Sequence, residues 1–115
     1  IWIALSKSSK KNGGVYYYCG SHKKGIIKHT PSFAKGTSQK IKDLKKLKRF
    51  KKSLPNLDIG DALVHHCLVV HGSYKNLSNY SRRGLTFQFK DKNVQYDNKK
   101  IKNYEKQLNF QIQKR

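Results

Sequence analysis

Apolar residues in this chain occur in short runs separated by polar segments that contain glycine, and this pattern limits the possible folds more than any other feature. Residues 1–5, 15–19 and 62–70 form such runs, each of strand length and rich in β-branched or aromatic side chains. Residues 82–89 alternate between polar and apolar side chains, as a strand with one covered face does. The sequence therefore predicts a mainly β fold, and its 115 residues suit a single domain.

The first half of the chain is predicted to contain a hairpin, a loop and a helix. Within residues 1–36, the first two apolar runs are expected to pair as a β-hairpin, because Asn12-Gly13-Gly14 between them suits a chain reversal, and the rest is mostly loop. A basic helix is predicted over residues 37–54, capped by Thr37 or Ser38. Its apolar positions recur at helical spacing among lysines: Ile41, Leu44, Leu47 and Phe50.

The second half is predicted to contain two strands and a terminal helix. Residues 57–90 hold both strands, the first over 62–70 and buried on both faces, the second over 82–89. Residues 97–115 are expected to form a helical tail with one apolar stripe, composed of Ile101, Tyr104, Leu108 and Ile112.

The charge of the chain is strongly positive, with 26 Lys and Arg against 6 Asp and Glu and a formal net charge of +20. Such a balance raises nucleic-acid binding as an alternative function. Only four of the 26 basic residues are arginines, however, and recognition of phosphates and bases favours arginine. We therefore interpret the lysines as a solvated surface and expect no nucleic-acid partner.

A membrane span is not expected, because His65 and His66 interrupt the longest apolar run. No signal peptide is recognisable at the start of the chain. The two cysteines form no CxxC pair, and we interpret them as reduced thiols of a cytoplasmic protein.

The best candidates for chemistry are a histidine and an arginine on neighbouring predicted strands. His71 stands where an apolar run meets a glycine-containing loop, and Arg82 begins the next strand. If both side chains face one cavity, a metal at the imidazole and the guanidinium would together suit a small dicarboxylate. Spacing alone does not establish this site, because a lone histidine near a strand end is more often structural. His65 and His66 are interpreted as packing or hydrogen-bonding residues.

Three blocks of sequence, in order, resemble the C-terminal part of the phytanoyl-CoA dioxygenase family. The first is Trp2-Ile3-Ala4-Leu5 followed by Asn12-Gly13, and the second is Gly20-Ser21-His22-Lys23. The third runs from Gly60-Asp61 through His71-Gly72-Ser73 to Asn76 and Arg82. The resemblance extends over roughly the first 90 residues.

This resemblance implies a double-stranded β-helix, a jelly roll of two facing antiparallel sheets, of which only a part is present. It also implies an oxygenase that uses Fe(II), 2-oxoglutarate as co-substrate, oxygen and a small-molecule substrate. His71 would then be the distal iron ligand, and Arg82 would bind the far carboxylate of 2-oxoglutarate. Ser73 and Trp2 would help to form the co-substrate pocket. Arg83 would replace Arg82 if the loop register slipped, and His22 would brace its loop without chemistry.

One departure from the family pattern concerns the metal site. The family holds iron with two histidines and one carboxylate, and the first two of these ligands come from a His-x-Asp motif. None of the five histidines here is followed two positions later by Asp or Glu. We therefore expect the chain to be part of a longer dioxygenase, inactive alone and completed by a missing N-terminal portion. An inactive gene remnant is a further alternative.

Overall fold

The computed structural model describes residues 1–34 and 39–114. Its residues group into two compact units, the first made of Ile1–Ile26 and Lys45–Phe89 and the second of Ile27–Leu44 and Lys90–Arg115. The first unit contains every block of the family resemblance, so it positions the predicted site.

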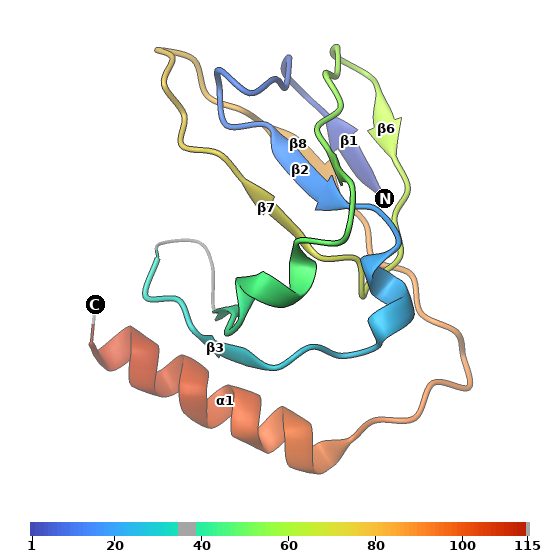
Figure 1. Cartoon of the computed structure of the whole chain (residues 1–115), viewed down its shortest axis with the longest axis vertical. Helices are drawn as coiled ribbons and strands as arrows, with labels where there is room; N and C mark the ends of the chain where they lie inside the picture. Colours follow the sequence, from blue (N-terminus) through green and yellow to red (C-terminus); the bar gives the residue numbers. More distant parts are fainter. Residues whose placement is uncertain (35–38, 115) are drawn as a thin grey trace. The chain divides into compact units, whose positions relative to one another are not determined.

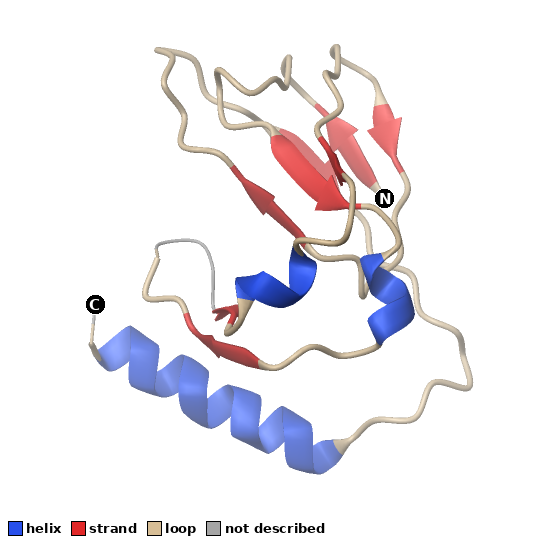
Figure 2. Ribbon diagram, viewed as in Figure 1, coloured by secondary structure: helices blue, strands red, loops and turns tan. Residues whose placement is uncertain are grey.

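The first unit is built from two small antiparallel sheets (Figures 1 and 2). One sheet has the order β6-β1-β8 and the other has the order β5-β2-β7. The strands are β1 (Trp2–Ala4), β2 (Val15–Tyr18), β5 (Lys52–Ser53), β6 (Ala62–Leu63), β7 (His71–Ser73) and β8 (Gly84–Thr86). Together with the C-terminal helix, these sheets confirm the predicted mainly β fold.

The predicted hairpin between the first two strands is wrong, because β1 and β2 belong to different sheets. The loop that joins them is fastened to distant segments instead, through bridges from Ser8 to Leu57 and from Asn12 to Asn76. Asn12 also stabilises the loop itself: its Nδ2 donates a hydrogen bond to the Lys7 carbonyl at 2.6 Å. These bonds hold the loop in place without a direct pairing of β1 with β2.

The predicted long strand over 62–70 is also wrong, since only Ala62–Leu63 is a strand and Val64 is 78% exposed. A turn follows, in which the Val69 amide donates to the His66 carbonyl at 3.0 Å. The Leu68 amide donates to the Nδ1 atom of His66 at 3.1 Å. The imidazole of His66 thus accepts a backbone hydrogen bond that a neighbouring strand would otherwise accept.

The alternation predicted for residues 82–89 matches the register of β8, although the strand itself covers only Gly84–Thr86. Leu85 lies opposite Ile3, while Gly84 and Thr86 lie opposite Ala4 and Trp2. Because opposed residues in an antiparallel pair project to the same side, Trp2 shares its face with the polar positions of β8.

The basic helix predicted over residues 37–54 is wrong for the described part of that range. Gln39–Ile41 is strand β4, Leu44–Leu47 is one short 3₁₀ helix, and Lys52–Ser53 is β5. Thr37 and Ser38, the predicted caps, lie outside the described residues. The segments on both sides of the 3₁₀ helix pair with other strands instead of continuing it. Closely spaced lysines also repel one another along a helix face, which disfavours a longer helix. Leu47 is buried whereas Leu44 is 63% exposed, so the predicted apolar stripe does not form.

The second unit pairs β3 (His29–Pro31) with β4 and contains the helix α1 (Asn98–Gln113). The helix confirms the predicted helical tail, but the fully buried residue is Gln111 rather than a member of the predicted stripe. Its Oε1 accepts hydrogen bonds from the Ser32 and Phe33 amides at 2.9 and 3.0 Å. None of the helices in residues 1–34 and 39–114 is long and apolar enough to cross a membrane.

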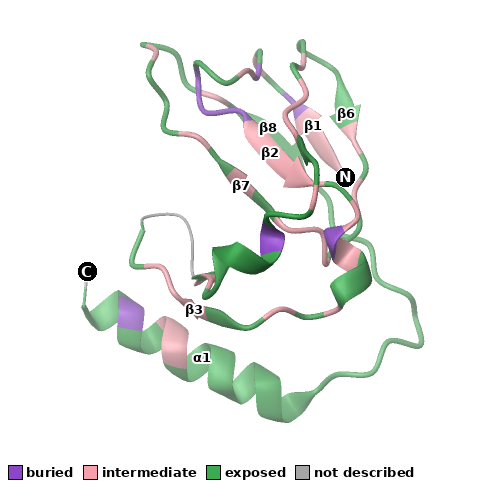
Figure 3. Cartoon of the chain, viewed as in Figure 1, coloured by how far each residue is buried: buried purple, intermediate pink, exposed green. Residues whose placement is uncertain are grey.

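Burial of apolar side chains is sparse (Figure 3). Among the described residues only Ala4 and Leu47 are apolar and buried, at 0% and 1% exposure. Phe87 and Phe89, which continue the apolar side of β8, are 45% and 77% exposed. Since burial of apolar surface is the main stabilising term, we expect a low free energy of unfolding for this chain alone.

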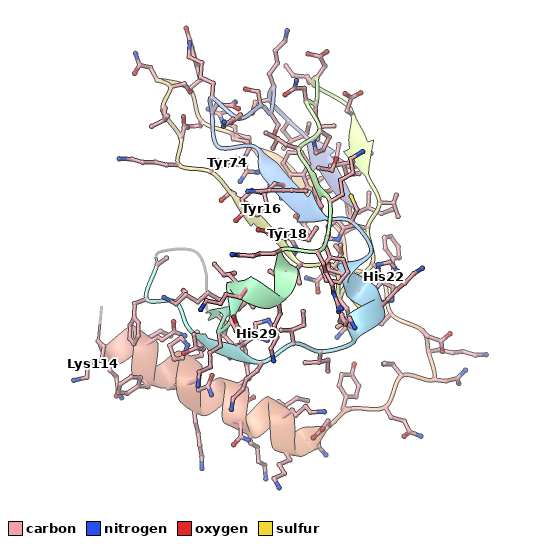
Figure 4. The ribbon with its side chains drawn as sticks, viewed as in Figure 1. Tyr16, Tyr18, His22, His29, Tyr74 and Lys114 are labelled. Carbon is pink, nitrogen blue, oxygen red and sulfur yellow. The ribbon has the colours of Figure 1, made fainter. Side chains whose placement is uncertain are left out.

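Tyr16 and Tyr18 lie on one face of the β5-β2-β7 sheet, which we call the outer face, and Figure 4 labels them together with Tyr74. Lys52 lies beside these three tyrosines. The Lys52 ammonium lies 3.7 Å from the ring centroid of Tyr16, 4.6 Å from that of Tyr74 and 5.9 Å from that of Tyr18. A hydrogen bond with Tyr74 is the main cause that raises the pKa of Lys52. The cluster fastens the short edge strand β5 to β2.

Lys52→Met should therefore lower the free energy of unfolding by at most about 1 kcal/mol, the range of exposed cation–π contacts. The neighbouring Lys51→Met removes the same charge from an exposed position and is the matched control. Equal effects of the two substitutions in urea unfolding would show that the tyrosines contribute nothing.

The start of α1 should respond to pH through Asp97, whose side chain accepts a hydrogen bond from the Lys100 amide at 3.0 Å. That bond lowers the pKa of Asp97 below its ordinary value of 3.8. The stabilisation is present above the ordinary value and is lost as pH falls through the lowered one. Helicity by circular dichroism should decline over that acidic range. Asp97→Asn should keep the cap but remove its share of the pH dependence, whereas Asp97→Ala should lower helicity at neutral pH.

Candidate functional site

The strand β7 begins at His71, and the register places Tyr17 of β2 directly opposite it. Both side chains therefore project from the same face of the β5-β2-β7 sheet. Their ring centroids lie 5.8 Å apart with an interplanar angle of 30°, a stacked arrangement. Tyr16 and Tyr18 project from the opposite face, as strand alternation requires.

The imidazole of His71 is held in one tautomer by its own backbone. Its Nδ1 atom lies 2.9 Å from the Val69 carbonyl oxygen, which can only accept, so Nδ1 carries the proton. Nε2 then keeps a lone pair. A hydrogen bond from the other ring nitrogen to a carbonyl is the usual arrangement behind a metal-bound histidine. The neutral form of His71 thus has the tautomer that a metal ligand needs.

A second imidazole adjoins this pair. The ring centroid of His65 lies 5.4 Å from that of His71 and 5.2 Å from that of Tyr17. The three rings form one cluster, which agrees with the interpretation of His65 as a packing residue. Across the part of the chain that the structure describes, no group of three or more His, Cys, Asp or Glu side chains could hold a metal ion.

Arg82 lies two residues before the start of β8 and is half-buried. Its guanidinium carbon lies 5.5 Å from the ring centroid of Trp2 on the adjacent strand β1. The indole of Trp2 lies across Gly84, where an added Cβ would collide with it. The missing side chain at Gly84 thus makes room for the indole, and the indole contacts Arg82.

Tyr17 interacts with one predicted site residue through its ring and with the other through charge. Burial raises the pKa of its phenol, and the positive charge of Arg82 partly opposes that rise. The Arg82 charge therefore reaches the hydroxyl of a tyrosine whose ring is stacked on His71. Sequence reasoning did not single out Tyr17.

The remaining predicted residues have distinct positions. Ser73 lies two residues after His71 on β7, opposite Val15, and so shares the face of His71. Arg83 follows Arg82 and is exposed, and its amide donates a hydrogen bond to the Ser6 hydroxyl at 2.8 Å. Strand alternation turns its side chain away from that of Arg82, so Arg82 is the arginine on the side of Trp2.

The Gly20-Ser21-His22-Lys23 block braces the strand of His71, but through serine rather than histidine. Ser21 is fully buried, and its hydroxyl accepts a hydrogen bond from the Val70 amide at 2.8 Å. Gly20 enters this turn with a φ of 79°, which favours glycine. His22 contacts His66 through its ring instead, at 5.2 Å between centroids. The order of residues in the block gave no signal that Ser21 would be the buried member.

A cavity of about 570 Å³ lies elsewhere in the first unit, between residues 6–12 and residues 77–81. Its lining residues include Lys7, Lys11, Leu77 and Tyr80, and most of the lining surface is apolar. Trp2, His71, Ser73 and Arg82 are not among its lining residues. The cavity is therefore distinct from the site predicted from the sequence.

Comparison with known proteins decides the family. The model of the family described as phytanoyl-CoA dioxygenase matches residues 1–84, well over half of the chain. The chain belongs to the phytanoyl-CoA dioxygenase family. A Danio rerio protein named phytanoyl-CoA dioxygenase domain-containing protein 1 is 31% identical over 90 residues, covering 76% of this chain and 31% of that protein. The chain thus spans about a third of this relative's length, and no solved structure matches it.

The phytanoyl-CoA dioxygenase match has a clear boundary on the structure. It includes β1, the complete loop from β7 to β8, and all four predicted site residues, whereas α1 lies beyond it. Phytanoyl-CoA dioxygenases are generally dependent on Fe(II) and 2-oxoglutarate. The first unit is therefore part of a dioxygenase-type domain.

Ser21→Ala should destabilise the site by leaving the buried Val70 amide without its partner. The expected loss in free energy of unfolding is about 1 to 3 kcal/mol. The same substitution at the exposed Ser81 serves as control and should change little. Urea unfolding of both variants is the measurement, and hydrogen exchange at Val70 should accelerate only in Ser21→Ala. Unchanged exchange there would contradict the assigned bracing role.

Proposed function

We propose that this chain is the C-terminal part of a 2-oxoglutarate-dependent dioxygenase of the hydroxylase type, acting on a small-molecule substrate. The observation that carries the proposal is the stacking of His71 on Tyr17, whose phenol also feels the charge of Arg82, together with the Nδ1 hydrogen bond that leaves Nε2 of the neutral His71 ring to bind a metal. A metal ligand and a carboxylate anchor that both act on one residue suit a short diacid that bridges them.

The strand order supports a jelly roll as the parent fold. β1 pairs with β6 and β8, and β2 pairs with β5 and β7, so the later strands alternate between two sheets. Such alternation is typical of jelly rolls, which have eight strands in two sheets. In the described part of the chain, β7 and β8 each pair on one side alone. Further strands beside them would extend both sheets at His71 and Arg82.

The residues present fit one corner of a non-haem iron site. His71 would supply one ligand through Nε2, and the usual facial set needs a second histidine and a carboxylate. The sequence has no His-x-Asp motif, so we assign the remaining ligands to another part of the protein. When bound, Fe(II) would supply the activation of oxygen that hydroxylation requires. Segments of the longer protein that pair with the free edge of β7 would lie closest to His71.

The other residues of this chain would bind and orient the co-substrate. Arg82 would pair with the far carboxylate of 2-oxoglutarate through two parallel hydrogen bonds. The indole of Trp2 limits the access of water to the guanidinium, which strengthens that ion pair. Ser73 would offer a hydroxyl from the face of His71. The surplus of positive charge would favour an anionic substrate.

Arg82→Ala should weaken the binding of 2-oxoglutarate to the chain by about tenfold to a hundredfold, because a charge-assisted pair is lost. Trp2 is the only tryptophan, so its fluorescence reports binding next to Arg82. Arg83→Ala removes the same charge one position away and should leave the affinity unchanged. Equal effects of both variants, or no binding by the original chain, would contradict the assignment of Arg82.

The chain alone should release no succinate when supplied with Fe(II), 2-oxoglutarate and oxygen, because one histidine does not complete the iron site. A longer protein that adds an upstream His-x-Asp motif should release succinate, and His71→Ala should abolish that release. Robust turnover by the 115 residues alone would refute the proposed division of ligands.

A further inference from the structure

The cavity between residues 6–12 and residues 77–81 has no part in the proposed function. Its volume of about 570 Å³ lies within the range of small-molecule pockets, about 300 to 1,000 Å³. None of the residues assigned to iron or to the co-substrate lines it. A molecule bound there would therefore be neither the metal nor 2-oxoglutarate.

The two loops that form the cavity are joined by hydrogen bonds. The Ser6 hydroxyl donates to the Ser81 carbonyl at 3.2 Å and accepts from the Arg83 amide at 2.8 Å. The Leu77 amide donates to the Lys11 carbonyl at 2.9 Å. Because these bonds hold the loops against each other, a ligand does not have to assemble the cavity, which lowers the entropic cost of binding.

The lining of the cavity combines apolar surface with positive charge. Leu77 and Tyr80 supply apolar surface from one loop and are 73% and 79% exposed, so water contacts them when no ligand is bound. Lys7 and Lys11 come from the other loop. Lys7 forms an ion pair with Asp58 at 3.3 Å, whereas Lys11 forms none within the described residues. The ammonium group of Lys11 is therefore free to bind an anion.

We propose that this cavity binds a small amphipathic anion, a carboxylate attached to an apolar body. The apolar body would cover Leu77 and Tyr80, and the carboxylate would pair with Lys11. A neutral molecule of the same shape gains only the apolar contact, and a bare carboxylate gains only the charge. The cavity therefore selects ligands that carry both groups.

The chain would be titrated calorimetrically at low ionic strength with 4-phenylbutyrate, with its neutral amide and with acetate. The amide and acetate should each bind about tenfold or more weakly than 4-phenylbutyrate, because each lacks one of the two interactions. Equal binding of the acid and the amide would show that the charge of the cavity has no role. Absence of 4-phenylbutyrate binding would overturn the proposal outright.

Lys11→Gln should weaken 4-phenylbutyrate binding by about tenfold, because a charge-assisted contact is lost. Lys10→Gln is the matched control, since Lys10 does not line the cavity and its ammonium lies 5.6 Å from the ring centroid of Tyr74 instead. Equal weakening by both substitutions would assign the binding to the general positive charge of the chain and not to the cavity.

The apolar contact and the location of the site have separate tests. Leu77→Ala should weaken 4-phenylbutyrate binding by about fivefold, because less apolar surface is covered. Val64→Ala shortens another exposed apolar side chain, away from the cavity, and should change nothing. Excess 2-oxoglutarate should not displace 4-phenylbutyrate. Displacement that Arg82→Ala abolishes would place the anion at Arg82 and overturn the proposal, whereas failure of 2-oxoglutarate to bind at all would affect only the proposed function.

Discussion

The pairing of β2 with β7 is the constraint on which the site depends. It places Tyr17 opposite His71 and Tyr16 opposite Gly72. A shift by one residue would turn His71 to the outer face and replace its aromatic neighbour, because side chains alternate with a period of two. Gly72 helps to fix the register: a Cβ there would lie 2.6 Å from the hydroxyl of Tyr16. The tyrosine thus fits against this strand only where a glycine lies opposite.

The second constraint is the long sequence separation between strands that must meet. β1 receives β6 on one edge and β8 on the other, and Trp2 reaches Arg82 only after that pairing forms. Contacts of this kind carry a large loop-closure entropy before they contribute any stability. The hydrogen bond from the Val70 amide to Ser21 joins segments 49 residues apart. Such bonds place His71, and they exist only once the sheets have assembled.

The sequence predicts the features that depend on nearby residues and misses those that depend on residues far away in the chain. Local signals were sufficient for the strand character around Val15–Tyr18, for α1, and for the choice of His71 and Arg82 as candidates. They failed where a distant partner decided the outcome. The apolar residues around Leu44–Leu47 have helical spacing, yet strand partners on both flanks leave one 3₁₀ turn. Tyr17 escaped notice because its place beside His71 depends on the register of β2 against β7, and its sequence neighbours do not encode that register.

The sparse core and the incomplete metal site have one physical origin under the proposed function. The apolar side of β8, with Phe87 at 45% exposure, has too little cover in the described residues for the burial expected of a stable β domain. His71 likewise supplies one ligand where iron needs three protein groups. β7 carries the single iron ligand and β8 carries the exposed apolar side chains, and each strand has one unpaired edge in the described residues. Strands added there would cover apolar surface and bring further side chains beside His71, so folding and metal binding would be completed by the same event.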